Sequence, residues 1–299
     1  MIRFLLPALL GSLLASCSIR NTAVNASASV IDEVQTSFFL ESDVALARES
    51  FPTFLKLAEA MHRFYPKSPY YSGKLCFLFT AYAFAFVDDS PWADTDEKGE
   101  AGMKRLLSFY DRAFEYGMAS MEASIPGWRR DLLSPSNSAR VLAKVRPKHV
   151  ETLFWLDFAW MMRILNNTAD PALLTQLAIA EKLALRIAEV QPDYLYGSVY
   201  AVLGAFWGGR SKAVGGDPEK ARAFNLKAES YAAGKSLIPA FVELRYHITQ
   251  TTDQKAFDAT LEEIRGFKAD CFPAFRFINE VIQHKTETLA KKKAMLFGG

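Results

Sequence analysis

The feature that most constrains this chain is the order of turn and capping residues between positions 191 and 234. A turn at residues 215–218 supplies Asp217, whose residue type favours a helix N-cap, and then Pro218, which suits the first helical position. Gly234 lies where a glycine commonly ends a helix. The segment therefore predicts a helical hairpin whose second helix begins at Pro218 and stops at Gly234.

Small residues recur where the two helices of this hairpin would cross. Gly204 lies in the first helix, and Ala221 and Ala228 share one face of the second. Small residues at a helix crossing, with aromatic side chains beside them, are typical of tetratricopeptide repeats. One such unit cannot bury its apolar face alone, so neighbouring hairpins must stack on it. We therefore predict an all-α solenoid of tetratricopeptide-like antiparallel hairpins, with about ten helices.

The remaining helices are predicted from apolar side chains that recur at helical spacing. No convincing alternating pattern of a strand is found after residue 40. Glycine and proline fall mostly between the periodic segments, which favours an all-helical chain. The expected helices cover residues 43–65, 75–87, 101–123, 149–165, 171–190, 238–251, 253–267 and 272–296.

Composition excludes several kinds of partner. The chain has 35 Lys and Arg against 33 Asp and Glu, so a basic surface for nucleic acid is not expected. Half of the residues are hydrophobic, which is enough to bury a large core. No spacing of cysteine and histidine resembles a metal site, and no cofactor is expected. The histidines are His62, His149, His247 and His284.

The N-terminus has the pattern of a bacterial lipoprotein export signal. Arg3 provides the positive charge, residues 4–14 form a short apolar run, and Leu14-Ala15-Ser16-Cys17 resembles a lipobox. The apolar run is too short to span a membrane. Cys17 is therefore expected to become the first mature residue and to carry palmitate or another acyl chain. The alternative is an ordinary signal peptide in which this cysteine is incidental.

These signals divide the chain into three parts. Residues 1–16 are expected to be a lipoprotein signal peptide, and residues 17–37, rich in Asn, Ser and Ala, a lipidated tether. Residues 38–299 would then form the tetratricopeptide-like domain. The protein is therefore expected to be exported and attached to a bacterial membrane only through its lipid.

Two further cysteines could pair in an oxidising compartment. Cys76 lies in an apolar helix, however, and Cys271 is far away in the sequence, which a solenoid would translate into distance. Free, buried thiols are therefore favoured over a disulfide.

The excess of aromatic side chains has two interpretations. The segment of residues 75–87 is apolar on every side, so it is either buried or lines an apolar cavity. Ordinary core packing is the simpler interpretation. The alternative is one cavity for a hydrophobic small molecule, lined by Phe79, Tyr82, Phe84, Phe86, Trp155, Phe158, Trp160, Tyr200, Phe206 and Trp207.

Asp157 and Arg163 interrupt the apolar helix of residues 149–165. Charges in such a helix are unfavourable unless they are paired. The simpler expectation is ion pairs across helices, and the alternative is that both are polar groups of the ligand cavity.

No catalytic residue is identified, and we do not expect an enzyme. Residues 94–99 resemble the start of a calcium loop, but Lys98 and Arg105 occupy positions that need oxygen ligands. The glycines of residues 208–216 have the wrong order for a phosphate loop, and no strand precedes them. A lytic enzyme with a helical superhelix would need an added lysozyme-like domain, for which the sequence leaves no room.

Several stretches together resemble the T-component family of tripartite ATP-independent periplasmic (TRAP) transporters, often called TatT. They follow one another over nearly the whole mature chain, after a lipobox. These stretches are Ala45-Leu46-Ala47-Arg48-Glu49, Tyr82-Ala83-Phe84-Ala85-Phe86-Val87-Asp88, Gly215-Gly216-Asp217-Pro218-Glu219-Lys220-Ala221 and Phe277-Ile278-Asn279.

The resemblance implies a periplasmic lipoprotein of tetratricopeptide-like hairpins that forms a homotrimer. It also implies binding to the substrate-binding P-component of the transporter and apolar cavities for a hydrophobic ligand. The leading hypothesis is therefore a TRAP transporter accessory that docks the P-component and binds or passes an apolar molecule. The alternative is a general envelope scaffold for protein partners, without a ligand cavity.

Overall fold

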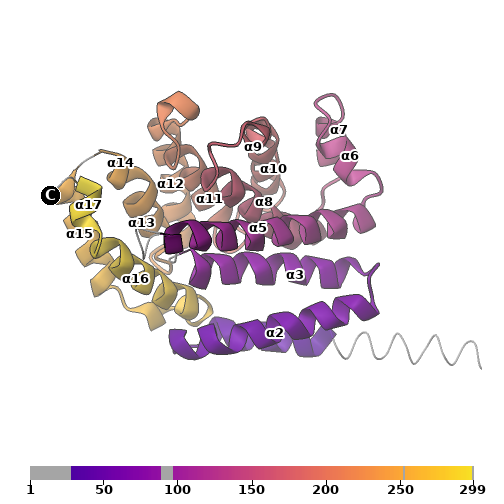
Figure 1. The fold of residues 1–299 in the computed structure, drawn as a ribbon, viewed down its shortest axis with the longest axis horizontal. Coiled ribbons are helices and arrows are strands. Elements are labelled where there is room, and N and C mark those ends of the chain that lie inside the picture. The colour runs from indigo at the N-terminus through magenta and orange to yellow at the C-terminus, as the bar shows by residue number, and fades with distance from the viewer. Residues whose placement is uncertain (1–27, 89–96, 252, 298–299) are drawn as a thin grey trace, which may run out of the picture.

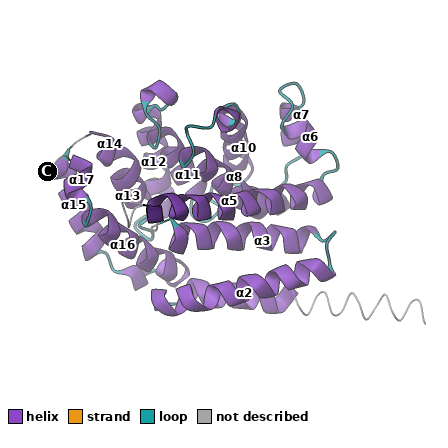
Figure 2. Ribbon diagram, viewed as in Figure 1, coloured by secondary structure: helices purple, strands orange, loops and turns teal. Residues whose placement is uncertain are grey.

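The structure is a computed structural model that describes residues 28–88, 97–251 and 253–297. Every regular element within these ranges is a helix, and they contain no strand (Figure 2). The prediction of an all-α chain is therefore confirmed. Whether the hairpins make a solenoid stays a prediction.

The chain starts on one side of the molecule with a helix over residues 28–40 and then α2 (Val44–Phe64) (Figure 1). The Asp43 carboxylate begins α2 because it accepts hydrogen bonds from the backbone N–H groups of Ala45 and Leu46. The predicted helix of residues 43–65 is thus present, and Asp43 is its N-cap.

The first helix changes the boundary that was expected between tether and domain. Residues 28–37 were assigned to the tether, but they are helical, and Ile31 is buried at 2% exposure. The Tyr70 hydroxyl oxygen lies 2.9 Å from both the Ala28 carbonyl oxygen and an Asp32 carboxylate oxygen, so its single proton can be donated to either. The packed part of the chain therefore extends to residue 28, because one face of this polar segment is apolar.

Three long helices form the middle of the molecule. They are α3 (Pro69–Tyr82), α5 (Glu97–Ser124) and α8 (Val150–Leu165), and each packs against the other two. The five residues after α3 form a π-helix, η2 (Ala83–Val87). Short helices α6 (Trp128–Leu132), α7 (Ser138–Leu142) and η3 (Pro147–His149) connect α5 to α8.

The central hairpin is present where its turn and capping residues predict it. Helix α11 (Ser198–Gly208) packs against α12 (Pro218–Ala232), and the Asp217 carboxylate accepts hydrogen bonds from the first backbone N–H groups of α12. Its last turn differs slightly, because Ala233 enters the left-handed region before Gly234 does. The preceding helix is broken into α9 (Pro171–Leu174) and α10 (Leu177–Val190). A short helix, η4 (Lys212–Val214), lies in the turn.

The C-terminal helices curve back toward the N-terminal ones, so that α16 contacts α2 (Figure 1). In a simple solenoid each repeat contacts only its neighbours. The C-terminal part of the molecule also contains η5 (Glu243–Ile248), the second π-helix of the described chain. The elements are α13 (Ile238–Val242), η5 (Glu243–Ile248), α14 (Thr249–Thr251), α15 (Gln254–Gly266), η6 (Ala269–Cys271), η7 (Pro273–Phe275), α16 (Arg276–Ala290) and α17 (Lys293–Phe297).

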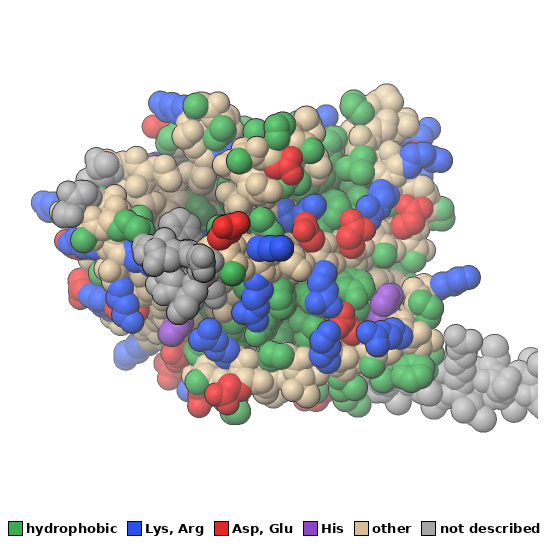
Figure 3. Space-filling model, viewed as in Figure 1, with side chains coloured by type: hydrophobic (Ala, Val, Ile, Leu, Met, Phe, Trp, Pro, Cys, Tyr) green, Lys and Arg blue, Asp and Glu red, His purple; other side chains and the backbone are tan. Residues whose placement is uncertain are grey.

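Surface charge is mixed. On the face drawn in Figure 3, basic and acidic side chains are interspersed, in keeping with the nearly balanced composition.

Both described cysteines are free, as expected, and Cys76 is buried. Cys271 is exposed, which corrects the expectation that both thiols are buried. It lies in the short turn of η6, outside any long packed helix.

Close approach of the three middle helices requires a glycine at position 117. A methyl group on Gly117 of α5 would lie 2.8 Å from the Cys76 sulfur and 2.9 Å from Leu156 Cβ. Contacts this short require the helices to move apart, because Leu156 Cβ is fixed to the backbone of α8.

We predict that Gly117→Ala destabilises the protein. Overpacking of a core costs about 1–3 kcal/mol, whereas replacing glycine in a helix interior gains at most about 1 kcal/mol. Because Leu156 Cβ is fixed to the backbone, the overpacking cost should lie in the upper half of its range, at about 2–3 kcal/mol, so urea unfolding should show a net loss of about 1–2 kcal/mol. Gly266→Ala is the matched control, because no atom lies within 4 Å of the added methyl group. An unchanged midpoint for Gly117→Ala would contradict the proposed close packing.

Candidate functional site

An apolar pocket of about 130 Å³ lies among the N-terminal, middle and C-terminal helices. Gln35, Phe38 and Phe39 of the first helix line it, together with residues of α3, α8 and α11. Further lining residues come from α2, η2, α13, η5, η7 and α16. Segments from every third of the chain therefore contribute to one cavity.

Aromatic rings form a continuous row along the pocket. Successive ring centroids in this row are 4.8–6.1 Å apart, within the range of favourable aromatic contacts. The row starts at the first helix and ends at α13. Its members are Phe39, Phe77, Trp155, Phe158, Phe84 and Phe241.

Polar groups are few in the lining, and two of its hydroxyls bond within the protein. Ser198 Oγ donates to the Leu195 carbonyl over 2.5 Å, and the Tyr246 hydroxyl donates to the Met162 sulfur over 3.8 Å. Burial and the charge of Asp88 raise the pKa of Tyr246 to about 12 against the opposing effect of Arg245, so its hydroxyl stays protonated at neutral pH. Such a lining suits an apolar ligand.

A strained turn contributes to the wall. Leu195, Tyr196 and Gly197 have φ angles of +44°, +54° and +74° in succession, a conformation that costs the two non-glycine residues of order 1–3 kcal/mol each. It places Leu195 in the pocket lining. The Tyr196 ring packs on Phe275, another lining residue, with centroids 5.0 Å apart. The turn therefore holds two parts of the wall together.

The structure brings three of the predicted aromatic residues to this pocket, namely Phe84, Trp155 and Phe158. The other seven rings do not line it. They are Phe79, Tyr82, Phe86, Trp160, Tyr200, Phe206 and Trp207.

Of these seven rings, the four on α3, η2 and α8 fill the spaces between helices. Phe79 is fully buried against Tyr116, with the Arg112 guanidinium 3.9 Å from its ring centroid. Tyr82 and Phe86 lie against each other, with centroids 5.4 Å apart. Trp160 packs on α5 and donates a hydrogen bond from Nε1 to a glutamine side chain over 2.7 Å.

The other three of the seven rings lie on α11 and pack toward α12 and the turn that joins α11 to α12. Tyr200 stacks on Tyr231 with ring centroids 5.4 Å apart. The Arg210 guanidinium lies 4.0 Å from the centroid of Phe206, and the Lys220 ammonium lies 3.6 Å from that of Trp207. These three contacts fit a packing role for the rings of the hairpin.

Sequence reasoning missed the lining residues of the first helix and of residues 238–278, and it also missed others on the predicted helices, such as Phe51, Phe77 and Phe154. The adjacent pair Phe38-Phe39 was a usable signal, because two exposed rings beside a polar tether are unfavourable. The C-terminal residues gave no comparable signal. Their place in the pocket depends on the long-range contact of α16 with α2.

Arg163 and Asp157 have different environments, and neither lines the pocket. Arg163 Nε donates a hydrogen bond to Asp111 Oδ1 over 2.6 Å, so its interhelical ion pair is confirmed. Asp157 is only 1% exposed, and its Oδ1 has no hydrogen-bond partner among the described residues. Burial therefore raises the pKa of Asp157 well above its ordinary value.

The described ranges give no support for a metal site or for a membrane-spanning helix. Searching them reveals no cluster of acidic, histidine or cysteine side chains that could hold a metal ion. No helix in them is long and apolar enough to cross a membrane. Cys17 lies outside the described residues, as do residues 94–96 of the rejected calcium motif.

Comparison with known proteins agrees with this apolar helical architecture. The profile of the family described as TRAP transporter T-component matches residues 40–297. The chain belongs to this family. A T-component is an accessory protein of a transporter rather than an enzyme.

An uncharacterized protein of Treponema pallidum (strain Nichols) is 28% identical to this T-component over 189 residues. The match covers 62% of this chain and 58% of the relative, so the chain spans less than two thirds of the relative's length.

We predict that Asp157→Asn stabilises this T-component at neutral pH. A raised pKa in the folded state means that the stability linked to Asp157 is complete below its ordinary pKa of 3.8 and is lost as the pH rises toward the folded value. The amide cannot ionise, so its advantage over wild type should grow with pH, by at most about 1.4 kcal/mol per unit.

Urea unfolding at pH 4, 5.5 and 7 measures this advantage. Asp111→Asn is a suitable control, because the Asp111 side chain is 55% exposed and pairs with Arg163. A stability difference between Asp157→Asn and wild type that is the same at every pH would show that Asp157 is ionised in the folded protein.

Proposed function

We propose that this T-component is a lipid-anchored periplasmic accessory that docks the substrate-binding P-component of its transporter and binds an apolar molecule. The observation that carries the ligand part is the row of rings along the pocket, from Phe39 to Phe241. The family match supports the transport part.

The pocket volume indicates the size of the ligand. A buried cavity of about 150 Å³ accommodates benzene, whereas drug-sized ligands occupy pockets of about 300–1,000 Å³. With about 130 Å³, this pocket suits a single ring or a short alkyl group. The ligand is thus a small apolar molecule or the apolar end of a larger one.

Self-association as a homotrimer is part of the proposal, and α2 offers a surface for it. Leu46, Leu57 and Phe64 are 53%, 47% and 68% exposed, and their spacing places them on one face of the helix. Exposed apolar side chains in a row commonly mark a protein interface. The P-component is the other candidate for this face.

The membrane anchor is proposed to be an acyl group on Cys17. We predict that Cys17→Ser releases the protein from the membrane fraction and blocks processing of its signal peptide, because a serine cannot carry the thioether-linked lipid. Fractionation followed by immunoblotting measures both effects, with Cys271→Ser as the control for loss of a thiol. Membrane binding equal to that of wild type would rule out Cys17 as the anchor.

The alternative function is a scaffold whose rings serve only as core, and a pair of truncations distinguishes the two. We predict that Phe79→Ala, away from the pocket, lowers the free energy of unfolding by about 3–5 kcal/mol and leaves benzene binding by the folded protein unchanged. Phe158→Ala should cost less, because Phe158 is only partly buried, and should change the benzene affinity.

Calorimetric titration with benzene and urea unfolding provide the two measurements. Equal destabilisation by both truncations, together with no benzene binding by wild type, would favour the scaffold.

A further inference from the structure

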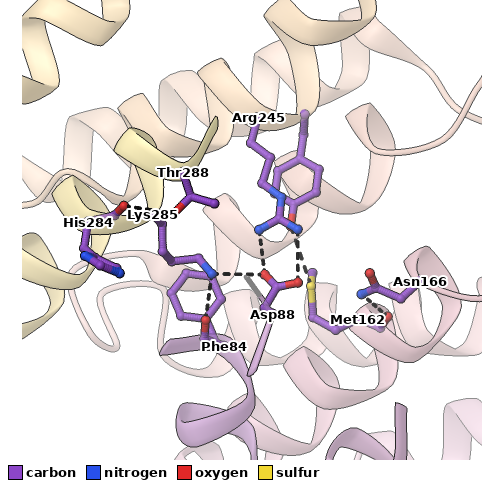
Figure 4. A network of polar contacts seen from close by, with 9 residues as sticks. Phe84, Asp88, Met162, Asn166, Arg245, His284, Lys285 and Thr288 are labelled. Atoms are coloured by element: carbon purple, nitrogen blue, oxygen red, sulfur yellow. Dashed lines mark hydrogen bonds and ion pairs between the residues drawn. The ribbon is translucent and has the colours of Figure 1, made fainter. Parts of the chain in front are cut away.

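Three buried charged side chains meet beside the pocket: Asp88, Arg245 and Lys285 (Figure 4). Arg245 donates two hydrogen bonds to the two carboxylate oxygens of Asp88, over 2.6 and 3.1 Å. Lys285 donates to the same carboxylate over 3.3 Å and to the Phe84 carbonyl over 2.8 Å. We refer to these three residues as the Asp88 network.

Both π-helices lead into this network. Asp88 directly follows η2, and Arg245 lies within η5. A π-helix contains an extra residue per turn, which changes the direction of the side chains that follow, and such segments are frequent at functional sites. Here each π-helix also provides a ring to the pocket, Phe84 from η2 and Tyr246 from η5.

The two cations lie close to rings that line the pocket. The Lys285 ammonium lies 4.8 Å from the centroid of Phe84. The Arg245 guanidinium lies 5.8 Å from the centroid of Phe241 and 5.2 Å from that of Tyr246. Phe84 and Phe241, at one end of the aromatic row, and the lining residue Tyr246 therefore lie against the Asp88 network.

We propose that the Asp88 network closes this end of the pocket and so limits the length of the alkyl group that a ligand can place there. The proposal extends the proposed function, because it states which apolar groups the pocket accepts. Phe84 is the central residue, since Lys285 contacts both its backbone carbonyl and its ring.

Lys285→Met is the variant that separates this role from folding. Removing Asp88 would leave two cations without their shared carboxylate in the interior, which is strongly destabilising. Removing the Lys285 ammonium leaves Asp88 and Arg245 bonded through two hydrogen bonds. Methionine is unbranched and flexible, so it fills most of the space of the lysine stem.

The experiment titrates wild type and Lys285→Met with benzene and with alkylbenzenes whose straight side chains have one to six carbons. Affinity for wild type should rise about fourfold per carbon until the closed end is reached, and then stop rising. In Lys285→Met this limit should move to a longer side chain, so that the longest probes gain at least about fourfold relative to benzene.

Lys293→Met is the matched control, because it removes the same charge from an ion pair with Asp258 near the surface. It should retain the wild-type limit. If Lys285→Met changes the affinities for all probes by one factor, Lys285 affects only stability, and the inference is wrong while the proposed function stands.

A second measurement needs no ligand. Backbone amide hydrogen exchange should be at least about tenfold faster in residues 84–88 of Lys285→Met than of wild type, and unchanged in α10. If wild type binds none of the probes, the proposed function fails, and this exchange result alone decides whether the network holds the segment. Unchanged exchange in residues 84–88 would overturn the inference.

Discussion

The arrangement of this T-component depends on the contact between Asp88 and Arg245, two residues that are 157 positions apart in the chain. A buried charge without a partner is prohibitively unfavourable, and Lys285 adds a second cation at the same carboxylate. These side chains can therefore be buried only together, which requires η5 and α16 to return to the end of η2. The pocket lies within the closed arrangement that results, with walls from both ends of the chain.

The same kind of side chain has two roles along one helical segment. Phe79 lies in the α-helical part and fills the space toward α5, whereas Phe84 lies in η2 and borders the pocket. The two residues are five positions apart, so they project from different sides of the segment. The all-round apolar sequence of residues 75–87 follows from this, because one side packs on the middle helices and another on the cavity.

Local chemistry made the helices predictable, whereas the site depends on contacts that no local pattern encodes. Asp217 caps α12 as its position predicts, because an N-cap bonds only to the next residues of the chain. Periodicity also identified the buried rings. Periodicity could not distinguish the pocket residue Phe84 from the core residue Phe79. It indicates that a side chain is buried, but not whether the space next to that side chain is filled. The partners of Asp88 lie beyond any sequence spacing, and the two π-helices that bring them together have no recognised sequence signature.

Asp88 and Asp157 show how the surroundings of a buried carboxyl group determine its pKa and its contribution to stability. Burial alone would raise the pKa of Asp88, but Arg245 and Lys285 lower it to about 2, whereas Asp157 has only the effect of burial and its pKa is raised. The stability linked to Asp88 is complete above its ordinary pKa of 3.8 and is lost as the pH falls toward about 2. That linked to Asp157 is complete below 3.8 and is lost as the pH rises. At neutral pH the closed arrangement is thus supported by the ionisation of Asp88 and opposed by that of Asp157, so two buried carboxyl groups of one chain link its stability to pH in opposite directions.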